Sequence, residues 1–498
     1  MSLGVENQSK KDLLLRLVQQ QTEIIKQQTE IDHLKHQLSL FQKALFGEKK
    51  EKHIGVPSEQ IQLNFNENID LDLPGDKELQ EVNYRRKKAV KKRTDFSKLD
   101  IPSDLERVDI ILEPLDKSDD MVKISEEVTE LLAITSQKFF VKRIIRPKYA
   151  KANKQGIIIA ELPSRPIQGG MVDVSLLTVL VADKYLDHMP LHRQRKKYAR
   201  LGVKLSDATL GDWTAKACIL LSFLYNELVK WVLKSRYLQA DETPIQVLDK
   251  AKKGSSHRGY YWVYHDVGNG LVLYEYDQSR GQHAPHTFLK DYEGYLQSDG
   301  YSVYSALPTQ NITLLCCMAH ARRHFFDAQQ NDKARATWVL DKMQILYAVE
   351  AYAREHTLNP SQRLALRQEK SIPILTEIKT WLDTHLLQTT PKSPIGKAIA
   401  YSLNRWDKLS VYTNDGILEI DNNLVENAIR PVALGRKNYL FAGSHEAAKR
   451  AGMIYSFLAC CKKNNINPHI WLSDTLQKLP NTKTTDLHLL LPTKDWKI

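Results

Sequence analysis

Hydrophobic residues recur at a seven-residue interval in the first part of the chain. Every seventh position is Leu or Ile at Leu17, Ile24, Ile31, Leu38 and Leu45. A second series, four residues before each of these, is partly apolar. Two such series place an apolar stripe on one side of a helix, which a partner helix can bury. The pattern predicts a coiled-coil zipper in the first 47 residues, with an amphipathic helix packed on its own domain as the alternative.

The following stretch, residues 48–105, is polar and is typical of a linker. Residues 85–93 contain seven basic residues in nine. Such a run is usually solvated, but beside a polyanion it would contact phosphates without reading bases. Both interpretations stay open for this run, and the candidate DNA contacts in it are Arg85, Arg86, Lys87 and Lys88.

Two further segments precede residue 236, where the pattern of apolar residues changes from one typical of helices to one typical of strands. Residues 106–160 alternate apolar and polar positions in places and predict a small, strand-rich module. Residues 161–235 predict helices, with a basic helix ending near a turn at Gly202 and a second helix capped by Ser206. This order is the signature of a helix-turn-helix, although ordinary helical hairpins share it. We predict DNA contacts from the basic helix, at Arg193, Arg195, Lys196 and Lys197.

From residue 236 onward, runs rich in Val, Tyr and Trp alternate with helical patterns. Five strands are expected, the second and third as a hairpin. They cover residues 237–240, 260–265, 271–276, 294–298 and 312–317. The first of them ends, on this pattern, at Asp241. Residues 328–410 then predict an almost entirely helical stretch, followed by a helix that carries residues 421–431 and by a helical tail.

Composition narrows the class of protein. The chain has 498 residues with 71 Lys and Arg against 59 Asp and Glu, which gives a net charge of +12. A basic balance favours a polyanionic partner such as nucleic acid, although charge alone is a weak argument. Five cysteines do not form a disulfide scaffold and fit a reducing cytosol. No apolar run approaches the ~18 residues that span a bilayer, and the N-terminus lacks the apolar core of a signal peptide. We therefore expect a cytoplasmic protein without a membrane segment.

Three carboxylates could carry chemistry. Asp241 and Asp299 each follow a predicted strand, and Glu426 lies on a later helix. Carboxylates at strand ends can converge at one sheet edge, where oxygen ligands suit Mg²⁺. Two such ions about 3.5–4 Å apart can support in-line phosphoryl transfer. The alternative is that both aspartates are turn or cap residues, as the dipeptide Asp299-Gly300 also allows. Positive charge near a phosphodiester would come from Arg430, Arg436 and Lys437.

A cysteine pair and two histidines invite a comparison with zinc sites. His320 and His324 lie four residues apart on a predicted helix, after Cys316 and Cys317. There is no second cysteine pair at finger spacing and no Glu between the histidines. Zinc is therefore unlikely, and the favoured interpretation is buried cysteines on a strand followed by a helix that places two arginines near phosphate, Arg322 and Arg323.

Several stretches together identify a family. In chain order they are Lys184-Tyr185 with Pro190–Gln194, Ala240–Pro244, Gln297–Tyr301, Ala319–Arg323, Asp421–Pro431 and Gly435–Ser444. With these motifs in this order, the chain resembles the insertion sequence 66 family of bacterial transposases. The resemblance covers nearly the whole chain. One departure concerns a zinc module with two Cys-x-x-Cys pairs, which the family usually carries, because residues 98–160 contain no cysteine here.

The resemblance implies a DDE-type enzyme with an α/β, ribonuclease-H-like catalytic domain and a helical insertion between the second and third carboxylates. It implies that Asp241, Asp299 and Glu426 bind two Mg²⁺ ions, with Mn²⁺ as a possible substitute. It also implies a dimerising zipper, a DNA-end-binding middle region and accessory proteins from the same element. The expected segments are 1–47, 48–105, 106–160, 161–235, 236–445 with the insertion at about 328–410, and 446–498.

The expected function is a DNA transposase of the bacterial cytoplasm, associated with the nucleoid. It would cleave the terminal inverted repeats of its element and join them to target DNA, working as a homo-oligomer held by the coiled coil. Two alternatives stay open. One is a transposase-derived DNA-binding protein that no longer cuts, and the other is a ribonuclease-H-like nuclease without strand transfer.

Overall fold

The computed structural model describes residues 138–146, 148–150, 157–159, 164–248, 256–307 and 311–497. The chain divides into two compact units, Met1–Gly75 and Asp76–Ile498, and every described residue belongs to the second. The predicted zipper, the linker and the basic run 85–93 lie outside the described residues. Of the predicted strand-rich module, the structure describes an antiparallel pair of short strands, β1 (Lys148–Ala150) and β2 (Ile157–Ile159).

A helical layer follows in the order that the sequence predicts. Gly202 has a φ of +87°, a backbone conformation that favours glycine, and it makes the turn between the second and third helices. Ser206 caps the third helix by accepting a hydrogen bond from the Thr209 amide at 3.0 Å. That helix is 27 residues long because its apolar stripe continues into the core. The helices are α2 (Val174–Tyr185), α3 (Leu191–Arg200) and α4 (Asp207–Leu233).

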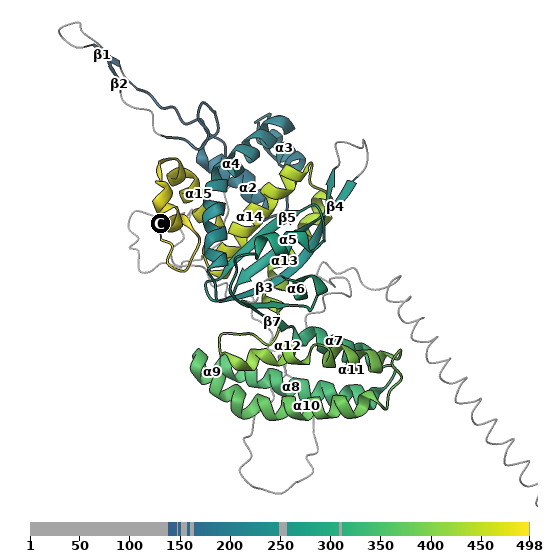
Figure 1. Ribbon diagram of the computed structural model, residues 1–498. Coiled ribbons are helices and arrows are strands. Elements are labelled where there is room, and N and C mark those ends of the chain that lie inside the picture. The colour runs from purple at the N-terminus through teal and green to yellow at the C-terminus, as the bar shows by residue number, and fades with distance from the viewer. Residues whose placement is uncertain are drawn as a thin grey trace, which may run out of the picture. The chain divides into compact units, whose positions relative to one another are not determined.

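The centre of the described chain is a mixed sheet with the strand order β5-β4-β3-β6-β7 (Figure 1). The first three strands of the sheet in chain order pair antiparallel, and the last two join in parallel beside β3. All five predicted strands are present. They are β3 (Tyr237–Leu248), β4 (Ser256–Asp266), β5 (Leu271–Asp277), β6 (Gly294–Ser298) and β7 (Ile312–Cys316).

One prediction about these strands is wrong. The first strand does not end at Asp241 but continues to Leu248, so that Asp241 lies within it. The parallel pairing with β6 stops at Gln239, whereas the antiparallel pairing with β4 continues to the end of the strand. Pro244 is compatible with a strand that has a partner on one side only at this point. The proline therefore lies in the part of the strand that pairs only with β4, and it does not end the strand.

The C-terminal helices pack on the sheet. On α14 the side chain of Ser456 accepts a hydrogen bond from the Tyr274 amide of β5 at 2.9 Å, and Cys460 Sγ accepts one from the Val272 amide at 3.1 Å. The helix thus covers the outer edge of β5, where unpaired backbone groups would otherwise be open to association. The helices of this part are α13 (Asn423–Tyr439), α14 (His445–Lys463) and α15 (Pro468–Lys478).

The predicted helical stretch forms a layer of its own, with a second hydrophobic core that reaches the sheet through Tyr237 and Leu315 (Figure 1). Along the chain, the short helix α5 (His283–Phe288) lies between β5 and β6, and the short helix α6 (Ser302–Ser305) lies between β6 and β7. None of the helices described is long and apolar enough to cross a bilayer. The layer consists of α7 (Met318–Ala328), α8 (Lys333–Glu355), α9 (Pro360–Leu366), a π-helical turn (Arg367–Ser371), α10 (Ile372–Leu386), α11 (Pro394–Leu403) and α12 (Trp406–Ser410).

Two buried glutamines join the sheet to the start of α13. Gln239 and Gln297 face each other across the parallel pair β3–β6, and both are fully buried. Gln239 Nε2 donates to Gln297 Oε1 at 3.0 Å and to the Asp421 carbonyl at 2.9 Å, while Gln239 Oε1 accepts from the Val425 amide at 3.2 Å. Gln297 Nε2 donates to the Glu419 carbonyl at 2.9 Å. The segment that leads into α13 is therefore fixed to the sheet by hydrogen bonds in the core.

This arrangement predicts that Gln297→Leu destabilises the protein. The change leaves the buried Glu419 carbonyl without its donor, which costs roughly 1–3 kcal/mol per unsatisfied group. Urea denaturation followed by circular dichroism measures the loss. Gln246→Leu, an exposed glutamine on the neighbouring strand β3, is the control and should change stability little. Equal losses in the two variants would contradict the role of the glutamine pair.

Candidate active site

Asp241 lies within β3, and Asp299 is the first residue after the neighbouring parallel strand β6. Gln239 pairs with Gln297 in the ladder, and each aspartate lies two residues further along its own strand direction. Side chains two residues apart point to the same face of a sheet. Both aspartates therefore follow the glutamine pair on one face, at the edge where the parallel ladder ends.

Glu426 comes to this edge on the first turn of α13. Its neighbour Val425 is the residue whose amide is held by Gln239. Burial, with Asp421 and Asp299 acting in the same direction and Arg323 and Arg430 against it, raises the pKa of Glu426 to about 7.

Electrostatics link the three predicted carboxylates. Burial raises the pKa of Asp241 well above its ordinary value, and the nearby carboxylates of Glu242, Glu426 and Asp299 raise it further. Like charges that share a site oppose each other's ionisation. Along the chain, Asp299 lies 58 residues after Asp241, and Glu426 lies 127 residues after Asp299. The fold brings the three carboxylates close enough to act on one another electrostatically.

Asp299 also has the local role that the sequence left open. Its Oδ1 accepts a hydrogen bond from the Tyr301 amide at 2.8 Å, and Gly300 between them has a φ of +88°. The aspartate is therefore a turn residue as well as a member of the carboxylate cluster. The two interpretations are compatible, because the bond to the turn engages one of its two carboxylate oxygens.

Three further residues lie close to these carboxylates, and the sequence had drawn attention only to His320, as an unlikely zinc ligand. His320 Nδ1 lies 3.9 Å from Glu426 Oε1. Glu242 is nearly buried and accepts from Arg280 Nε at 2.9 Å. Asp421 caps the start of α13 by accepting from the Asn423 amide at 3.1 Å. The sequence signal that could have found them was their position: Glu242 follows Asp241, His320 lies two residues before Arg322, and Asp421 begins the stretch that contains Glu426.

The donor set suits a divalent cation. Among the described residues, no three His, Cys, Asp or Glu side chains stand in an arrangement that could already hold a metal ion. Asp241, Asp299 and Glu426 nevertheless offer the carboxylate oxygens that Mg²⁺ prefers. Burial and the repulsion between these carboxylates together raise the pKa of Asp241. A bound cation would relieve the repulsion. The residues therefore fit Mg²⁺ by their chemistry.

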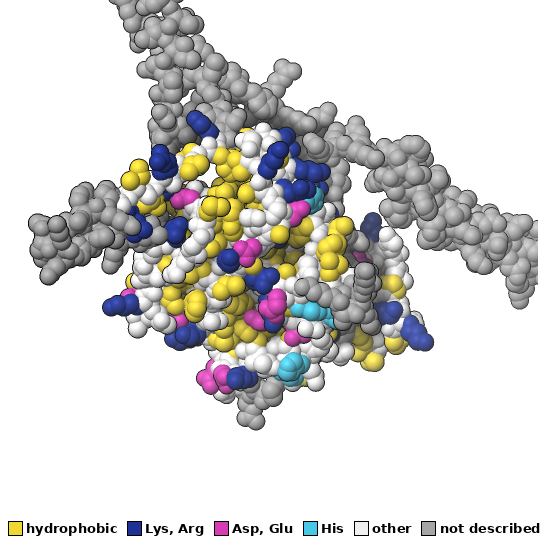
Figure 2. Space-filling view, turned by 90° about the horizontal axis from the view of Figure 1, so that it is seen from above, with side chains coloured by type: hydrophobic (Ala, Val, Ile, Leu, Met, Phe, Trp, Pro, Cys, Tyr) yellow, Lys and Arg dark blue, Asp and Glu magenta, His cyan; other side chains and the backbone are white. Residues whose placement is uncertain are grey.

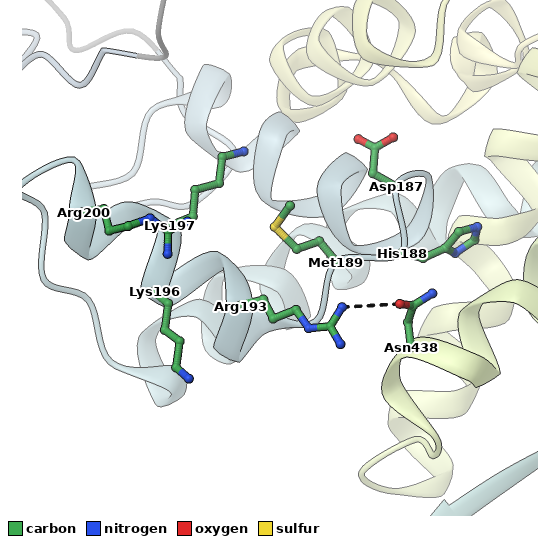
Figure 3. Close-up of a pocket in the computed structure, with 8 residues that line it drawn as sticks. All are labelled: Asp187, His188, Met189, Arg193, Lys196, Lys197, Arg200 and Asn438. Carbon is green, nitrogen blue, oxygen red and sulfur yellow. Dashed lines mark hydrogen bonds between the residues drawn. The ribbon is translucent and has the colours of Figure 1, made fainter. Parts of the chain in front are cut away.

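The basic residues of α3 line a surface pocket of about 360 Å³ (Figure 3). Arg193, Lys196 and Arg200 lie along it, and Arg193 Nη1 donates to Asn438 Oδ1 of α13 at 3.4 Å. Figure 2 looks down on the part of the molecule that carries α2, α3 and α15, and it shows Lys and Arg side chains in groups between hydrophobic surface. The pocket thus connects the predicted DNA-binding helix with the helix that carries Glu426.

Other predicted DNA contacts are partly engaged within the protein. Arg195 pairs with Asp207 and Lys197 with Asp183. Arg436 Nη1 donates to the Pro244 carbonyl of β3, so it joins α13 to the sheet.

The remaining predicted contacts divide between the site and the surface. Arg323 of α7 and Arg430 of α13 act electrostatically on Glu426. Arg322 lies beside Arg323 on α7, and Lys437 is exposed at the end of α13. The contacts predicted at Arg85, Arg86, Lys87 and Lys88 lie outside the described residues.

Comparison with known proteins identifies the family. Residues 169–450, more than half of the chain, match the model described as "Transposase IS66 family". The chain belongs to this transposase family. Residues 456–493 of the IS66-family chain match the "IS66 C-terminal element", and residues 33–110 match "Transposase C of IS166 homeodomain".

Relatives of the IS66-family chain occur in Sinorhizobium fredii. The uncharacterized protein y4qI is 30% identical over 477 residues, which cover 91% of this chain and 87% of the relative. The uncharacterized protein y4hP is 31% identical over 427 residues, with 80% and 76% covered. The family match thus confirms the resemblance predicted from the sequence and supports a DNA partner.

The raised pKa of Glu426 predicts a pH dependence of stability in the metal-free protein. The ordinary value of the carboxyl is 4.5, and the folded chain raises it to about 7. Since the folded state binds this proton more tightly, stability rises as the pH falls from 8 through 7 toward 4.5. At ~1.4 kcal/mol per pK unit, the gain between pH 8 and pH 5 is on the order of 2–3 kcal/mol. Urea unfolding in EDTA between pH 5 and 8 measures it.

Glu426→Gln should lack this gain and should be more stable than the wild type at pH 8. Glu446→Gln, an exposed glutamate on α14, is the control and should keep the wild-type slope. The same pH slope in wild type and Glu426→Gln would contradict a raised pKa at this carboxyl.

Proposed function

We propose that this chain is a DDE-type transposase that cleaves the ends of its insertion sequence and joins them to target DNA. One observation carries the proposal. Asp241 of β3 and Asp299, directly after β6, each lie two residues beyond a member of the buried glutamine pair, and the helix carrying Glu426 is anchored to that pair. The sheet, with three antiparallel strands followed by two parallel ones, supports a ribonuclease-H-like catalytic domain.

Asp241, Asp299 and Glu426 would hold Mg²⁺, or Mn²⁺ in its place. Bound at these carboxylates, the metal would supply Lewis-acid stabilisation of the phosphoryl group and activation of the attacking oxygen. The carboxylates would hold the cation at the edge where the parallel ladder of β3 and β6 ends. In cleavage, water attacks the phosphorus and the bond to the 3′ oxygen breaks. In joining, the freed 3′-hydroxyl would attack a target phosphodiester, so that a new bond from its oxygen to phosphorus forms while the target's own bond between phosphorus and the 3′ oxygen breaks and leaves a 3′-hydroxyl on the target strand.

Positive side chains around the carboxylates would bind the substrate. Arg323 and Arg430 lie close enough to act on Glu426, and a guanidinium can bind phosphate oxygens in bidentate fashion. The pocket at α3 would hold the DNA backbone further from the cut. Accessory proteins and assembly through the predicted zipper belong to the same proposal.

The proposal predicts that Asp241→Asn and Glu426→Gln abolish cleavage and leave binding of the DNA end unchanged. Each variant removes one charge that holds the metal, without removing the side chain's volume. A gel assay of Mg²⁺-dependent nicking and joining on DNA with the element's ends measures the result. Asp291→Asn, an exposed aspartate, is the control and should remain active.

Two outcomes would point to the alternative functions. A wild-type chain that binds ends and never cuts them, in Mg²⁺ or in Mn²⁺, indicates a DNA-binding protein. Nicked products without joined ones indicate a nuclease. Full activity in Asp241→Asn would contradict the assignment of the carboxylates.

The α3 pocket predicts a salt-dependent contribution to binding. Lys196→Gln removes one phosphate contact, which should weaken end binding and reduce the slope of log K against log salt by about 1. Fluorescence anisotropy at several salt concentrations measures this slope. Lys230→Gln, an exposed lysine of α4 that pairs with Glu227, should leave it unchanged. Identical slopes for wild type and Lys196→Gln would remove the pocket from the DNA path.

A further inference from the structure

The helical insertion contains a cluster of buried charges. Glu350 of α8 and Arg367 of the π-helical turn have fully buried side chains and form two parallel bonds, from Nε to Oε1 at 2.7 Å and from Nη2 to Oε2 at 2.8 Å. Arg363 of α9 donates to the same carboxylate at 2.6 Å. Burial alone would raise the pKa of Glu350, but the two guanidinium groups outweigh it and hold that pKa below its ordinary value. We name Glu350, Arg363 and Arg367 the arginine clamp.

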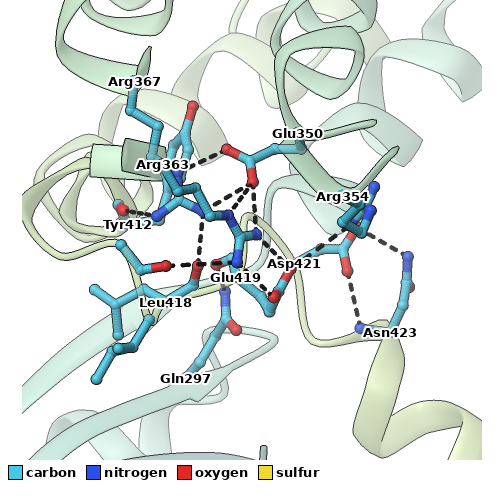
Figure 4. A network of polar contacts seen from close by, with 12 residues as sticks. Gln297, Glu350, Arg354, Arg363, Arg367, Tyr412, Leu418, Glu419, Asp421 and Asn423 are labelled. Atoms are coloured by element: carbon cyan, nitrogen blue, oxygen red, sulfur yellow. Dashed lines mark hydrogen bonds and ion pairs between the residues drawn. The ribbon is translucent and has the colours of Figure 1, made fainter. Parts of the chain in front are cut away.

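The clamp holds the segment that returns from the insertion to the sheet, residues 412–422 (Figure 4). Arg367 Nη1 donates to the carbonyls of Tyr412 at 2.7 Å and Asp415 at 2.8 Å, and Nη2 donates to the carbonyl of Leu418 at 2.7 Å. One buried guanidinium thus engages three carbonyls of the segment. Each of these backbone groups would be costly to leave unpaired in the core.

Glu419 connects the clamp to the sheet. Arg363 donates two hydrogen bonds to the Glu419 carboxylate, from Nη1 to Oε1 at 2.9 Å and from Nη2 to Oε2 at 2.8 Å (Figure 4). The backbone of Glu419 donates to Tyr237 Oη at 3.3 Å and accepts from Gln297 Nε2 at 2.9 Å. This residue lies seven positions before Glu426. The clamp and the glutamine pair therefore hold the two sides of the same short segment.

The insertion also contacts the turn that carries the second aspartate. Tyr401 of α11 donates from its hydroxyl to the Asp299 carbonyl at 2.9 Å. Arg405 Nη2 donates to the Gly300 carbonyl at 3.3 Å, and the Arg405 guanidinium lies 4.1 Å from the centre of the Tyr401 ring. Two of the three carboxylate-bearing segments are thus bound by side chains of the insertion.

We propose that the arginine clamp is a positioning device that fixes where α13 begins, and so where the Glu426 carboxylate lies relative to Asp241 and Asp299. This inference rests on the proposed function. Buried ion pairs are weak sources of stability, and apolar side chains of similar volume would serve an insertion that only had to fold. What the clamp adds is a fixed geometry at the return segment. Its three members are positioning residues, because they act through the return segment and not by contact with Asp241, Asp299 or Glu426.

Arg363→Lys and Arg367→Lys test the clamp, since lysine keeps the charge and loses the planar fork. The matched control is Arg335→Lys, which alters the arginine that pairs with Asp332 at the start of α8, away from the return segment. We expect unchanged affinity for DNA ends and a fall in single-turnover cleavage of about 100-fold in the clamp variants, the size of effect that a displacement near 1 Å produces. Hydrogen–deuterium exchange should become faster in residues 419–426 and stay unchanged in α8 and α10.

The two readouts separate the inference from the proposed function. If wild type cleaves and the clamp variants cleave at its rate, the clamp is overturned and the transposase assignment stands. If wild type does not cleave, the assignment fails, and exchange in residues 419–426 still decides the clamp. Unchanged exchange there, or an equal loss of cleavage in Arg335→Lys, would overturn it. Should Arg367→Lys not fold, Arg363→Lys carries the test, because its side chain is 12% exposed.

Discussion

The buried hydrogen bonds between Gln239, Gln297 and the segment before α13 are the constraint on which the candidate site depends. A parallel pair of strands fixes the two glutamines opposite each other, and the same register places Asp241 and Asp299 two residues further on. The polar ends of the glutamines have no water to bind in the core, so they must find partners in the protein. They find them at Glu419, Asp421 and Val425. Satisfying two buried amides thus brings to the aspartates a helix whose Val425 lies 186 residues after Gln239 in the chain.

The result is a site in which several carboxyl groups lie close together and oppose one another's ionisation. Burial and neighbouring carboxylates raise the pKa values of Asp241 and Glu426, and the arginines nearby only partly oppose this for Glu426. A site of this kind is stable when protonated or when a cation is bound, which fits a metal-dependent phosphoryl transferase. The rigid support comes from two directions, the sheet through its glutamines and the insertion through Arg363 and Arg367. In this account the insertion belongs to the machinery that positions the carboxylates.

Local patterns in the sequence predicted most of the helices and strands, but few of the hydrogen bonds and ion pairs between residues far apart in the chain. Strands rich in Val and Tyr, the Gly202 turn and the Ser206 cap depend on neighbours in the chain, and all are present in the structure. The end of β3 was misplaced because Pro244 looks the same in a turn and in a strand with one open side. Gln239 and Glu350 gave no signal, because a polar residue on a strand or helix usually faces water and their partners lie far away in sequence. The three carboxylates were singled out at the ends of predicted strands and on a later helix, where a turn role for the aspartates stayed open, and the resemblance to a family then implied their metal-binding role.

The most direct test of the central claim is to map where a divalent cation binds. Fe²⁺ substituted for Mg²⁺, with ascorbate and peroxide, cuts the backbone next to the metal, and mass spectrometry locates the cuts. The account predicts cuts near Asp241, Asp299 and Glu426 together, suppressed by excess Mg²⁺ and lost in Asp241→Asn. Cuts near only one of these residues, or a pattern that persists unchanged in Asp241→Asn, would contradict a single metal site built from the three carboxylates.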